Sequence, residues 1–375
     1  MPIQLKEVKT KKDLRKFIKF PFKLYKGNKY YVPPMIQFEM NTLLKEKNPA
    51  FEIADAIYWV AEKNGEIVGR IAAIALDMEL KEKKLIRFGW IDFIDDLEVS
   101  KALINQAEEW GKQKGAEAIH GPMGFTDLDY EGALISGFDQ IATQAAIYNY
   151  PYYAKHYENL NLEKAVDWIE FRGIPPKKLP ERYERLASII SKRFGIKALH
   201  LKKAKDVRKY ATEMFKVLND SYSQLYGYYP LTSKQINYYV EQYLGMVRKE
   251  YICLIVDRED KIIGIGISFP SLSKAFQKAK GSLFPFGFIH ILKDFWFNKH
   301  LDLLLIGVTP EYQKKGAASL MFSEFFKNYI KNGVEYYSTG PMLEDNSPIQ
   351  NMWNEYDKNV PSVNIRRRCY KKKIS

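Results

Sequence analysis

The chain has 375 residues, of which 46% are hydrophobic and 27% charged, and its formal net charge is +13. This length exceeds one ordinary hydrophobic core and fits two domains, and the composition is typical of a globular rather than a disordered protein. Two cysteines exclude a disulfide framework, and neither they nor the five scattered histidines predict a metal site.

No window approaches the roughly 18 apolar residues of a transmembrane helix, and the first residues lack the apolar core of a signal peptide. We therefore expect a cytoplasmic protein. The positive charge is concentrated in residues 192–209 and 366–373. A coenzyme, a nucleic acid or a membrane surface are possible anionic partners, but no recognition helix or RNA-binding signature accompanies the charge. We favour a solvated lysine-rich surface and do not expect nucleic acid as a partner.

The first half contains a predicted hairpin, helix and strand. Residues 58–75 read YWVAEKNGEIVGRIAAIA, two apolar runs on either side of Asn64-Gly65, and this dipeptide is a strong signal for a hairpin turn. A helix over 103–114 is predicted to end at a glycine cap. The next strand ends in Gly121-Pro122-Met123.

The second half repeats this order. Residues 251–269, YICLIVDREDKIIGIGISF, predict another hairpin, and a helix over 320–332 precedes a strand that ends in Gly340-Pro341-Met342. Because a helix between neighbouring strands is a crossover, these strands should pair in parallel, which gives each half a mixed sheet. Between the halves lies the stiff linker GIPPKKLP, 173–180, followed by a helix over 181–193.

The stretch that carries chemistry is 300–318, HLDLLLIGVTPEYQKKGAA. It predicts an apolar strand ending at Val308, a turn, and a helix opened by Gln313. The amides and dipole of a helix start favour an anion. Small residues at Gly316 and Ala318 let a phosphate approach the backbone, and neighbouring lysines add charge.

Here the sequence resembles the GNAT superfamily of acyl-CoA-dependent N-acyltransferases. The family signature is Gln or Arg, two variable residues, Gly, one variable residue, then Gly or Ala, after a strand ending in Val-x-Pro. The matching residues are Val308, Pro310, Gln313, Gly316 and Ala318. The segment HYENLNLEK, 156–164, is similar to the family's usual ending. The resemblance therefore covers both halves.

The resemblance implies an α/β fold of two tandem GNAT-like domains, each a mixed, mostly antiparallel sheet flanked by helices. We place the domains at 1–174 and 196–375, joined by 175–195. It also implies that acetyl-CoA or another acyl-CoA binds the second domain. The residues implied in coenzyme binding are Val308, Gln313, Lys314, Lys315, Gly316, Ala317, Ala318 and Asn346.

The first copy lacks this loop. Aligning Gly115 with Gly333 gives an offset of 218, which places 95–100, DDLEVS, on 313–318. Three carboxylates would then face the diphosphate, with Glu98 in place of Gly316. Like charges at short range repel, so we predict a degenerate N-terminal copy that does not bind coenzyme in this way.

The resemblance also implies catalytic roles. A backbone amide near the strand end, that of Val308, would face the thioester oxygen, and a carboxylate would act as base. The candidates for the base are Glu344, Asp345 and Asp302. The family's acid, a tyrosine seven residues after Asn346, is replaced by Trp353, whose indole cannot protonate a thiolate. We therefore assign the acid to Tyr356, one turn further on.

Residues 281–300 contain six aromatic residues and interrupting Pro and Gly. We favour packing against the N-terminal half, with an acyl-pocket lid or a membrane-contacting loop as alternatives. The predicted function is N-acylation of a small-molecule or peptide amine, with N-acetylation as the first expectation and the N-terminal copy shaping the acceptor site. The alternatives are a non-catalytic acyl-CoA-binding protein, suggested by Trp353, and a nucleic-acid-binding protein, suggested by the charge.

Overall fold

The computed structural model describes residues 2–346 and 365–374, apart from the side chains at 204 and 244. The chain forms two compact units. Unit 1 comprises Met1–Ile169, Ser273–Ile291 and Ile365–Ser375, and unit 2 comprises Glu170–Leu272 and Leu292–Asn364. The packing thus groups the chain differently from the contiguous division predicted at 174 and 195, because two segments of the second half belong to unit 1. How the repeat divides along the sequence stays a prediction.

Unit 1 is built on a mixed sheet with the strand order β1-β2-β3-β4-β5-β15-β7, and β6 also pairs with β15. β2 and β3 form the predicted hairpin, and its turn residues Asn64 and Gly65 have φ of +56° and +79°. β4 and β5 are parallel, as the crossover predicted. The strands are β1 (Gln4–Glu7), β2 (Ala54–Lys63), β3 (Glu66–Leu76), β4 (Leu85–Phe93), β5 (Ala118–Gly121), β6 (Ala133–Ser136), β7 (Glu163–Glu170) and β15 (Ile365–Lys373).

The crossover helix of unit 1, α4 (Leu97–Gln113), begins earlier than the predicted residue 103 because Asp96 provides an N-cap. It packs closely on β3: a Cβ at Gly69 would lie 2.8 Å from Leu103 and 2.9 Å from Val99. The other helices of this unit are α1 (Lys11–Leu24), α2 (Ile36–Leu43), α3 (Asp77–Lys83), α5 (Tyr152–Asn159) and α9 (Ser273–Ala279).

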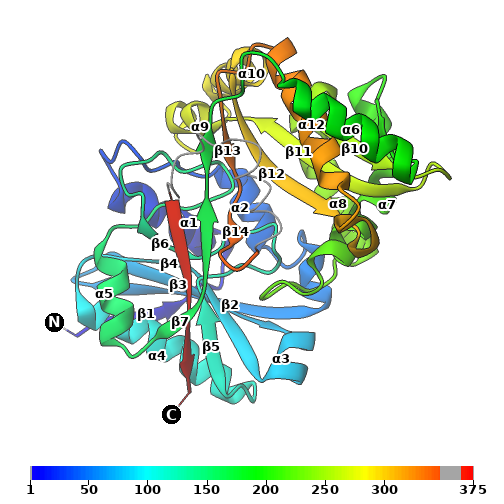
Figure 1. The fold of residues 1–375 in the computed structure, drawn as a ribbon. Helices are drawn as coiled ribbons and strands as arrows, with labels where there is room; N and C mark the ends of the chain where they lie inside the picture. The colour runs from blue at the N-terminus through cyan, green and yellow to red at the C-terminus, as the bar shows by residue number, and fades with distance from the viewer. Residues whose placement is uncertain (1, 347–364, 375) are drawn as a thin grey trace. The chain divides into compact units, whose positions relative to one another are not determined.

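The basic run at 366–368 is part of unit 1's sheet. β15, red in Figure 1, lies between β5 and β7. Arg368 donates to Asp167 at 2.8 and 3.0 Å, and Arg366 donates to the same carboxylate at 3.2 Å. Arg367 is 1% exposed. These three arginines therefore hold a strand in place, which removes part of the charge that suggested a nucleic-acid surface.

Unit 2 is built on a six-stranded sheet in the order β8-β13-β12-β11-β10-β9. β10 and β11 form the second predicted hairpin, β11 and β12 are antiparallel, and β12 and β13 are parallel. The strands are β8 (Arg172–Gly173), β9 (Lys197–Leu199), β10 (Ile252–Val256), β11 (Ile262–Pro270), β12 (His300–Val308) and β13 (Tyr336–Thr339), and β14 (Met342–Leu343) follows.

The crossover helix of unit 2, α12 (Ala317–Lys331), buries its apolar face on this sheet. Gly266 allows the approach, because a Cβ there would lie 2.5 Å from the Phe325 ring. The linker helix α6 (Glu181–Phe194) forms as predicted and packs against α12. The other helices of this unit are α7 (Val207–Tyr222), α8 (Ser233–Tyr243) and α11 (Pro310–Gln313).

One further helix, α10 (Gly287–Phe297), contains the division between the units at residues 291 and 292. The packing expected for the aromatic segment is wrong for Phe284, Phe286 and Phe297, whose exposed fractions are 75%, 68% and 77%. Among the described residues, no helix has the length and apolar character needed to cross a bilayer.

Candidate functional site

The parallel pairing of β12 and β13 in unit 2 is short. His300–Leu303 pair with Tyr336–Thr339, and the Gly340 amide donates to the Leu303 carbonyl at 2.7 Å where the ladder ends. β12 continues to Val308, and residues 304–306 are half-exposed. In the described part of the chain, this edge of β12 has no strand partner beyond Leu303.

The hydroxyl of Tyr222, from α7, contacts the main chain along this edge. It donates to the Ile306 carbonyl at 2.9 Å and accepts from the Ile306 amide at 3.4 Å. Two residues on, the Val308 carbonyl accepts from the Gln313 side chain at 3.0 Å. Alternate residues of an antiparallel ladder direct their main-chain groups to the same edge, so the Ile306 and Val308 amides both point away from β11. Nothing in the sequence singled out Tyr222, since no motif surrounds it.

The predicted anion loop follows Val308, but its helix begins later than expected. Gln313 ends the short helix α11, and Gly316, at φ +79°, is the N-cap of α12. No side chain caps this helix start. The amides of Ala317 and Ala318 therefore lie in the first turn of a 15-residue helix, where the dipole favours an anion.

The two lysines of the loop differ. Lys315 donates to Glu311 at 2.7 Å and lies over the Tyr312 ring at 4.2 Å. This hydrogen bond to the Glu311 carboxylate raises the pKa of Lys315. Lys314 is exposed. Lys314 thus brings a positive charge that is available to an anion, whereas the charge of Lys315 is shared with Glu311.

Asp302 lies on β12 just before the strands separate, opposite Ser338 of β13. It is 2% exposed, and its Oδ2 has no hydrogen-bond partner among the described residues. Burial raises the pKa of Asp302 to about 7, although a hydrogen bond from Ser271 and the charge of Arg172 oppose this shift. A carboxyl group with such a pKa can accept or release a proton near neutral pH.

The remaining predicted residues are less informative. Glu344 is half-buried in the turn after β14, and the neighbouring Asp345 is exposed. The Asn346 amide donates to the Leu343 carbonyl at 3.1 Å. Tyr356 and Trp353 lie outside the described residues. The roles assigned to Glu344, Asn346 and Tyr356 stay predictions.

The corresponding helix start in unit 1 is occupied by a carboxylate of the chain. The Asp96 side chain accepts from the Glu98 amide at 3.0 Å and from Lys63 at 2.8 Å. Hydrogen bonding to Lys63 lowers the pKa of Asp96. The fixed offset of 218 placed Glu98 at the position of Gly316, but as N-caps Asp96 and Gly316 correspond, because the two loops differ in length.

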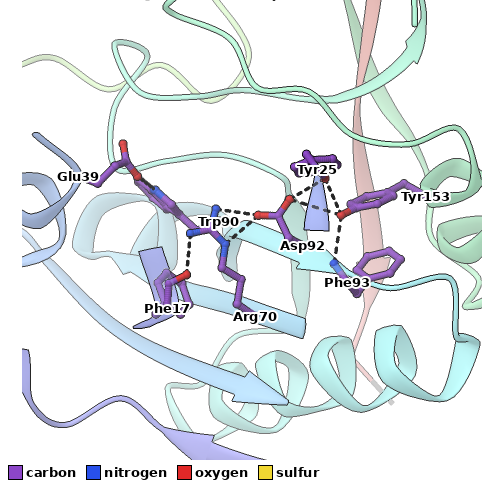
Figure 2. Close-up of polar contacts among 8 residues, drawn as sticks. All are labelled: Phe17, Tyr25, Glu39, Arg70, Trp90, Asp92, Phe93 and Tyr153. Atoms are coloured by element: carbon purple, nitrogen blue, oxygen red, sulfur yellow. Dashed lines mark hydrogen bonds and ion pairs between the residues drawn. The ribbon is translucent and has the colours of Figure 1, made fainter. Parts of the chain in front are cut away.

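At the corresponding strand edge of unit 1, tyrosine side chains hydrogen-bond to the main chain (Figure 2). Phe93 lies opposite Gly69, as Val308 lies opposite Gly264. The Phe93 amide donates to the Tyr153 hydroxyl at 3.1 Å. Its carbonyl accepts from Tyr152 at 2.6 Å. Tyrosines of α5 thus satisfy the main-chain groups that correspond to those of Val308.

Beside these tyrosines, unit 1 contains a buried polar network. Arg70 pairs with Asp92 at 2.7 Å and donates to the Phe17 carbonyl, and Trp90 donates to Glu39 at 2.7 Å (Figure 2). Burial raises the pKa of Glu39. The adjoining cavity measures about 20 Å³, which is room for about one water molecule. It is too small to receive an acyl acceptor.

Known proteins resemble this chain in sequence and in fold. No family model matches the chain. It is 29% identical over 358 residues to Protein YghO of Escherichia coli (strain K12), covering 92% of this chain and 89% of the relative. It is 26% identical over 314 residues to bacterial ceramide synthase of Caulobacter vibrioides (strain NA1000 / CB15N), covering 82% and 80%.

Among solved structures, the chain is similar to a tandem GNAT protein from the clavulanic acid biosynthesis pathway. The TM-score is 0.56 at 11% identity, and the match covers 100% of this chain and 99% of that one. The fold class predicted from the sequence is thereby confirmed. The chain has the tandem GNAT fold, with mixed sheets flanked by helices.

Proposed function

We propose that the chain is an acyl-CoA-dependent N-acyltransferase whose coenzyme site lies in unit 2. The observation that carries this proposal is the contrast between two helix starts. Gly316 leaves the start of α12 without a capping side chain, whereas Asp96 caps the start of α4 with a carboxylate. The tandem GNAT fold supports the same reading.

The residues of unit 2 fit the diphosphate of coenzyme A. The first-turn amides of α12 would hold it, and Lys314 would add charge. The Gln313 side chain donates to the Val308 carbonyl and so fixes the strand end against the loop; its role in coenzyme binding stays a prediction. The Val308 amide, at the edge of β12, is the next main-chain donor along the strand.

When bound, acyl-CoA supplies a thioester carbonyl that an amine can attack. We assign Asp302 as the base that takes the proton from the attacking amine, since its pKa of about 7 suits that transfer. Six residues of extended strand separate Asp302 from Val308, about 20 Å. The Ile306 amide faces the same edge four residues from Asp302, about 13 Å. We propose it as the oxyanion donor in place of the Val308 amide, with Asp302 taking the proton through intervening water.

The leaving thiolate needs a proton as the carbon–sulfur bond breaks and the carbon–nitrogen bond forms. Tyr222 presents its hydroxyl at the Ile306 main chain. We assign it this proton transfer, with Tyr356 as the alternative that the sequence suggested. The carboxylates of Glu344 and Asp345 remain alternatives to Asp302 as base.

The donor and the acceptor follow less directly from the fold. Acetyl-CoA is the simplest donor for a GNAT fold. The Caulobacter relative is named as a ceramide synthase, and a ceramide is the amide of a long-chain base. This relative favours a long acyl chain and a lipid amine as the substrates to be tried beside acetyl-CoA and small amines.

The experiment measures coenzyme A binding by isothermal titration calorimetry. Ala318→Glu places a carboxylate in the first turn of α12, where the helix dipole tolerates it, so folding is preserved. We expect one coenzyme per wild-type chain and an affinity about 100-fold lower in the variant, from charge repulsion at short range. Ser233→Glu, at the exposed start of α8 in the same unit, is the matched control and should bind as the wild type.

Equal affinities of Ala318→Glu and wild type, or no binding by the wild type, would refute the coenzyme site.

Turnover is tested by release of free thiol from acetyl-CoA and from a long-chain acyl-CoA with a panel of amines. Amine-dependent release supports transfer. Tight binding with no release across the panel would instead identify a non-catalytic acyl-CoA-binding protein.

A further inference from the structure

The helix α10, labelled in Figure 1, and the turn before it have large exposed apolar side chains. We call this set the aromatic surface; its members are Phe284, Phe286, Phe288, Leu292, Trp296 and Phe297. Five of them are more than half exposed, from 52% at Leu292 to 77% at Phe297. Other exposed large apolar residues, such as Ile174 of the linker at 73%, are not part of this helix.

The arrangement follows from helical spacing. Phe288, Leu292 and Trp296 are four residues apart and lie on one face of α10. A helix on the surface of a globular protein usually turns its apolar face to the core and its polar face to water. In α10 this face is exposed instead, while Gly287 is the buried residue. Such a contiguous apolar surface marks a binding site for a partner or a membrane.

The charge around the aromatic surface indicates which partner. Residues 273–300 contain five lysines and a single aspartate. Lys280, Lys293 and Lys299 are exposed. The guanidinium of Arg248 lies 5.5 Å from the Trp296 ring centre and donates to the Trp296 carbonyl. Apolar aromatic side chains surrounded by positive charge complement the apolar interior and anionic headgroups of a bilayer.

We propose that the aromatic surface docks this protein on the surface of an anionic lipid bilayer. α10 would lie in the plane of the interface, with its aromatic side chains among the upper acyl chains and the lysines at the headgroups. The net charge of +13 would strengthen the approach to such a membrane. The inference rests on α10 and its surroundings and does not depend on the acyl-transfer proposal.

The first test is flotation of the full chain with vesicles of phosphatidylcholine mixed with phosphatidylglycerol. We expect the wild type to float with these vesicles and much less with pure phosphatidylcholine. Phe297→Ser should lower the partition coefficient roughly tenfold, since a phenyl side chain no longer leaves water. Ile174→Ser, which removes an apolar side chain of similar exposure from the linker, should leave it unchanged.

The second test uses Trp296 as a probe of depth. Trp59, Trp90, Trp110 and Trp168 are at most 8% exposed, and Trp353 is removed by using Trp353→Phe as the reference chain. Quenching by lipids with brominated acyl chains should then report mainly on Trp296. We expect strong quenching in this reference chain that is lost when Trp296→Phe is added. The variant should still float, because phenylalanine also partitions into the interface.

Several outcomes would overturn the proposal. A wild-type chain that stays with the unbound fraction, or equal losses in Phe297→Ser and Ile174→Ser, would show that the aromatic surface does not bind lipid. Quenching that persists in Trp296→Phe would place another segment at the membrane. Sedimentation equilibrium that finds a dimer dissociated by Phe297→Ser would assign the surface to a second copy of the chain.

Discussion

Ile190 of α6 lies against the backbone of Gly316 in unit 2. An ideal Cβ built on Gly316 would stand 2.7 Å from the Ile190 Cδ1 atom, and its φ of +79° already disfavours any side chain. Two structural reasons therefore require glycine at the start of α12, apart from any ligand. Gly316→Glu would disturb the loop itself, which is why the coenzyme test uses Ala318.

The effect of this contact on stability can be compared with that of a glycine that has the same φ. Gly65 also has φ +79°, but no atom lies within 4 Å of its Cβ position. We expect Gly65→Ala to lower the free energy of unfolding by about 1 kcal/mol and Gly316→Ala by about 2 to 3 kcal/mol, because the second adds overpacking. Urea unfolding checks both. Ile190→Val should lower the free energy of unfolding less in the Gly316→Ala background than in the wild type. Equal losses of this free energy in Gly65→Ala and Gly316→Ala would contradict the contact.

The proposed base gives a prediction about rate. Asp302→Asn removes the proton acceptor, so kcat/KM for the amine should fall about 100-fold or more. In the wild type kcat/KM should rise with pH through the region near 7, where Asp302 ionises. Glu335→Gln, which changes an exposed carboxylate of the same unit, should keep the wild-type rate and pH profile. Full activity in Asp302→Asn would exclude this base.

The same carboxyl group makes stability depend on pH. Burial raises its folded pKa from 3.8 to about 7. Between these values the unfolded chain ionises its aspartate while the folded chain keeps the proton, so stability is lost as pH rises. Asp302→Asn should be more stable than the wild type above pH 7, by on the order of 2 to 4 kcal/mol, and similar to it below pH 4. Thermal unfolding at several pH values checks this.

The carboxylate at the start of α4 gives a test of the asymmetry between the units. Asp96→Ala removes the cap and the partner of Lys63, and should lower the free energy of unfolding by about 1 kcal/mol. The coenzyme stoichiometry should stay at one, because Tyr153 still covers the Phe93 amide. A second equivalent of coenzyme bound by Asp96→Ala in calorimetry would show that the Asp96 cap alone prevents coenzyme binding to unit 1.

The C-terminal strand depends on Asp167. Burial would raise its pKa, but hydrogen bonds from Arg368 and Lys164 outweigh burial and lower the pKa below 3.8. Its stabilising effect is therefore complete above the unfolded pKa and is lost as pH falls through the folded one. Asp167→Ala should lower the free energy of unfolding by about 3 kcal/mol at neutral pH, and less at pH 3.

Asp55→Ala provides the control for this prediction. Asp55 pairs with Lys114 at 2.5 Å, but its side chain is 54% exposed. The loss should stay below about 0.5 kcal/mol. Equal losses in the two variants, measured by urea unfolding, would show that the arginines do not hold β15 through Asp167.

The parts of the fold that could be predicted rest on local chemistry. Asn64-Gly65 forms its hairpin turn because both residues accept positive φ, and the crossovers follow from a helix between two strands. The strand that ends at Val308 and the helix after the loop were predicted, but the start of α12 was placed too early. α11 ends at Gln313, and Gly316 in the left-handed region is the N-cap of α12; a linear motif does not reveal this break.

The rest depends on partners far apart in the sequence. Arg366 and Arg368 suggest a charged tail until Asp167 supplies their partner. The sequence offered three acids as the catalytic base, and Asp302 is distinguished from the other two only by its burial in the fold. The covering of the Phe93 amide by Tyr153 depends on how α5 packs, and no spacing in the sequence predicts it.

The position of β15 has a consequence for biosynthesis. This strand lies between β5 and β7, yet the ribosome makes it after every strand of unit 2. While unit 2 is being translated, β5 and β7 cannot yet pair with β15, which has not been synthesised. A nascent chain halted before Ile365 would therefore expose two unpaired strand edges to chaperones and to neighbouring chains.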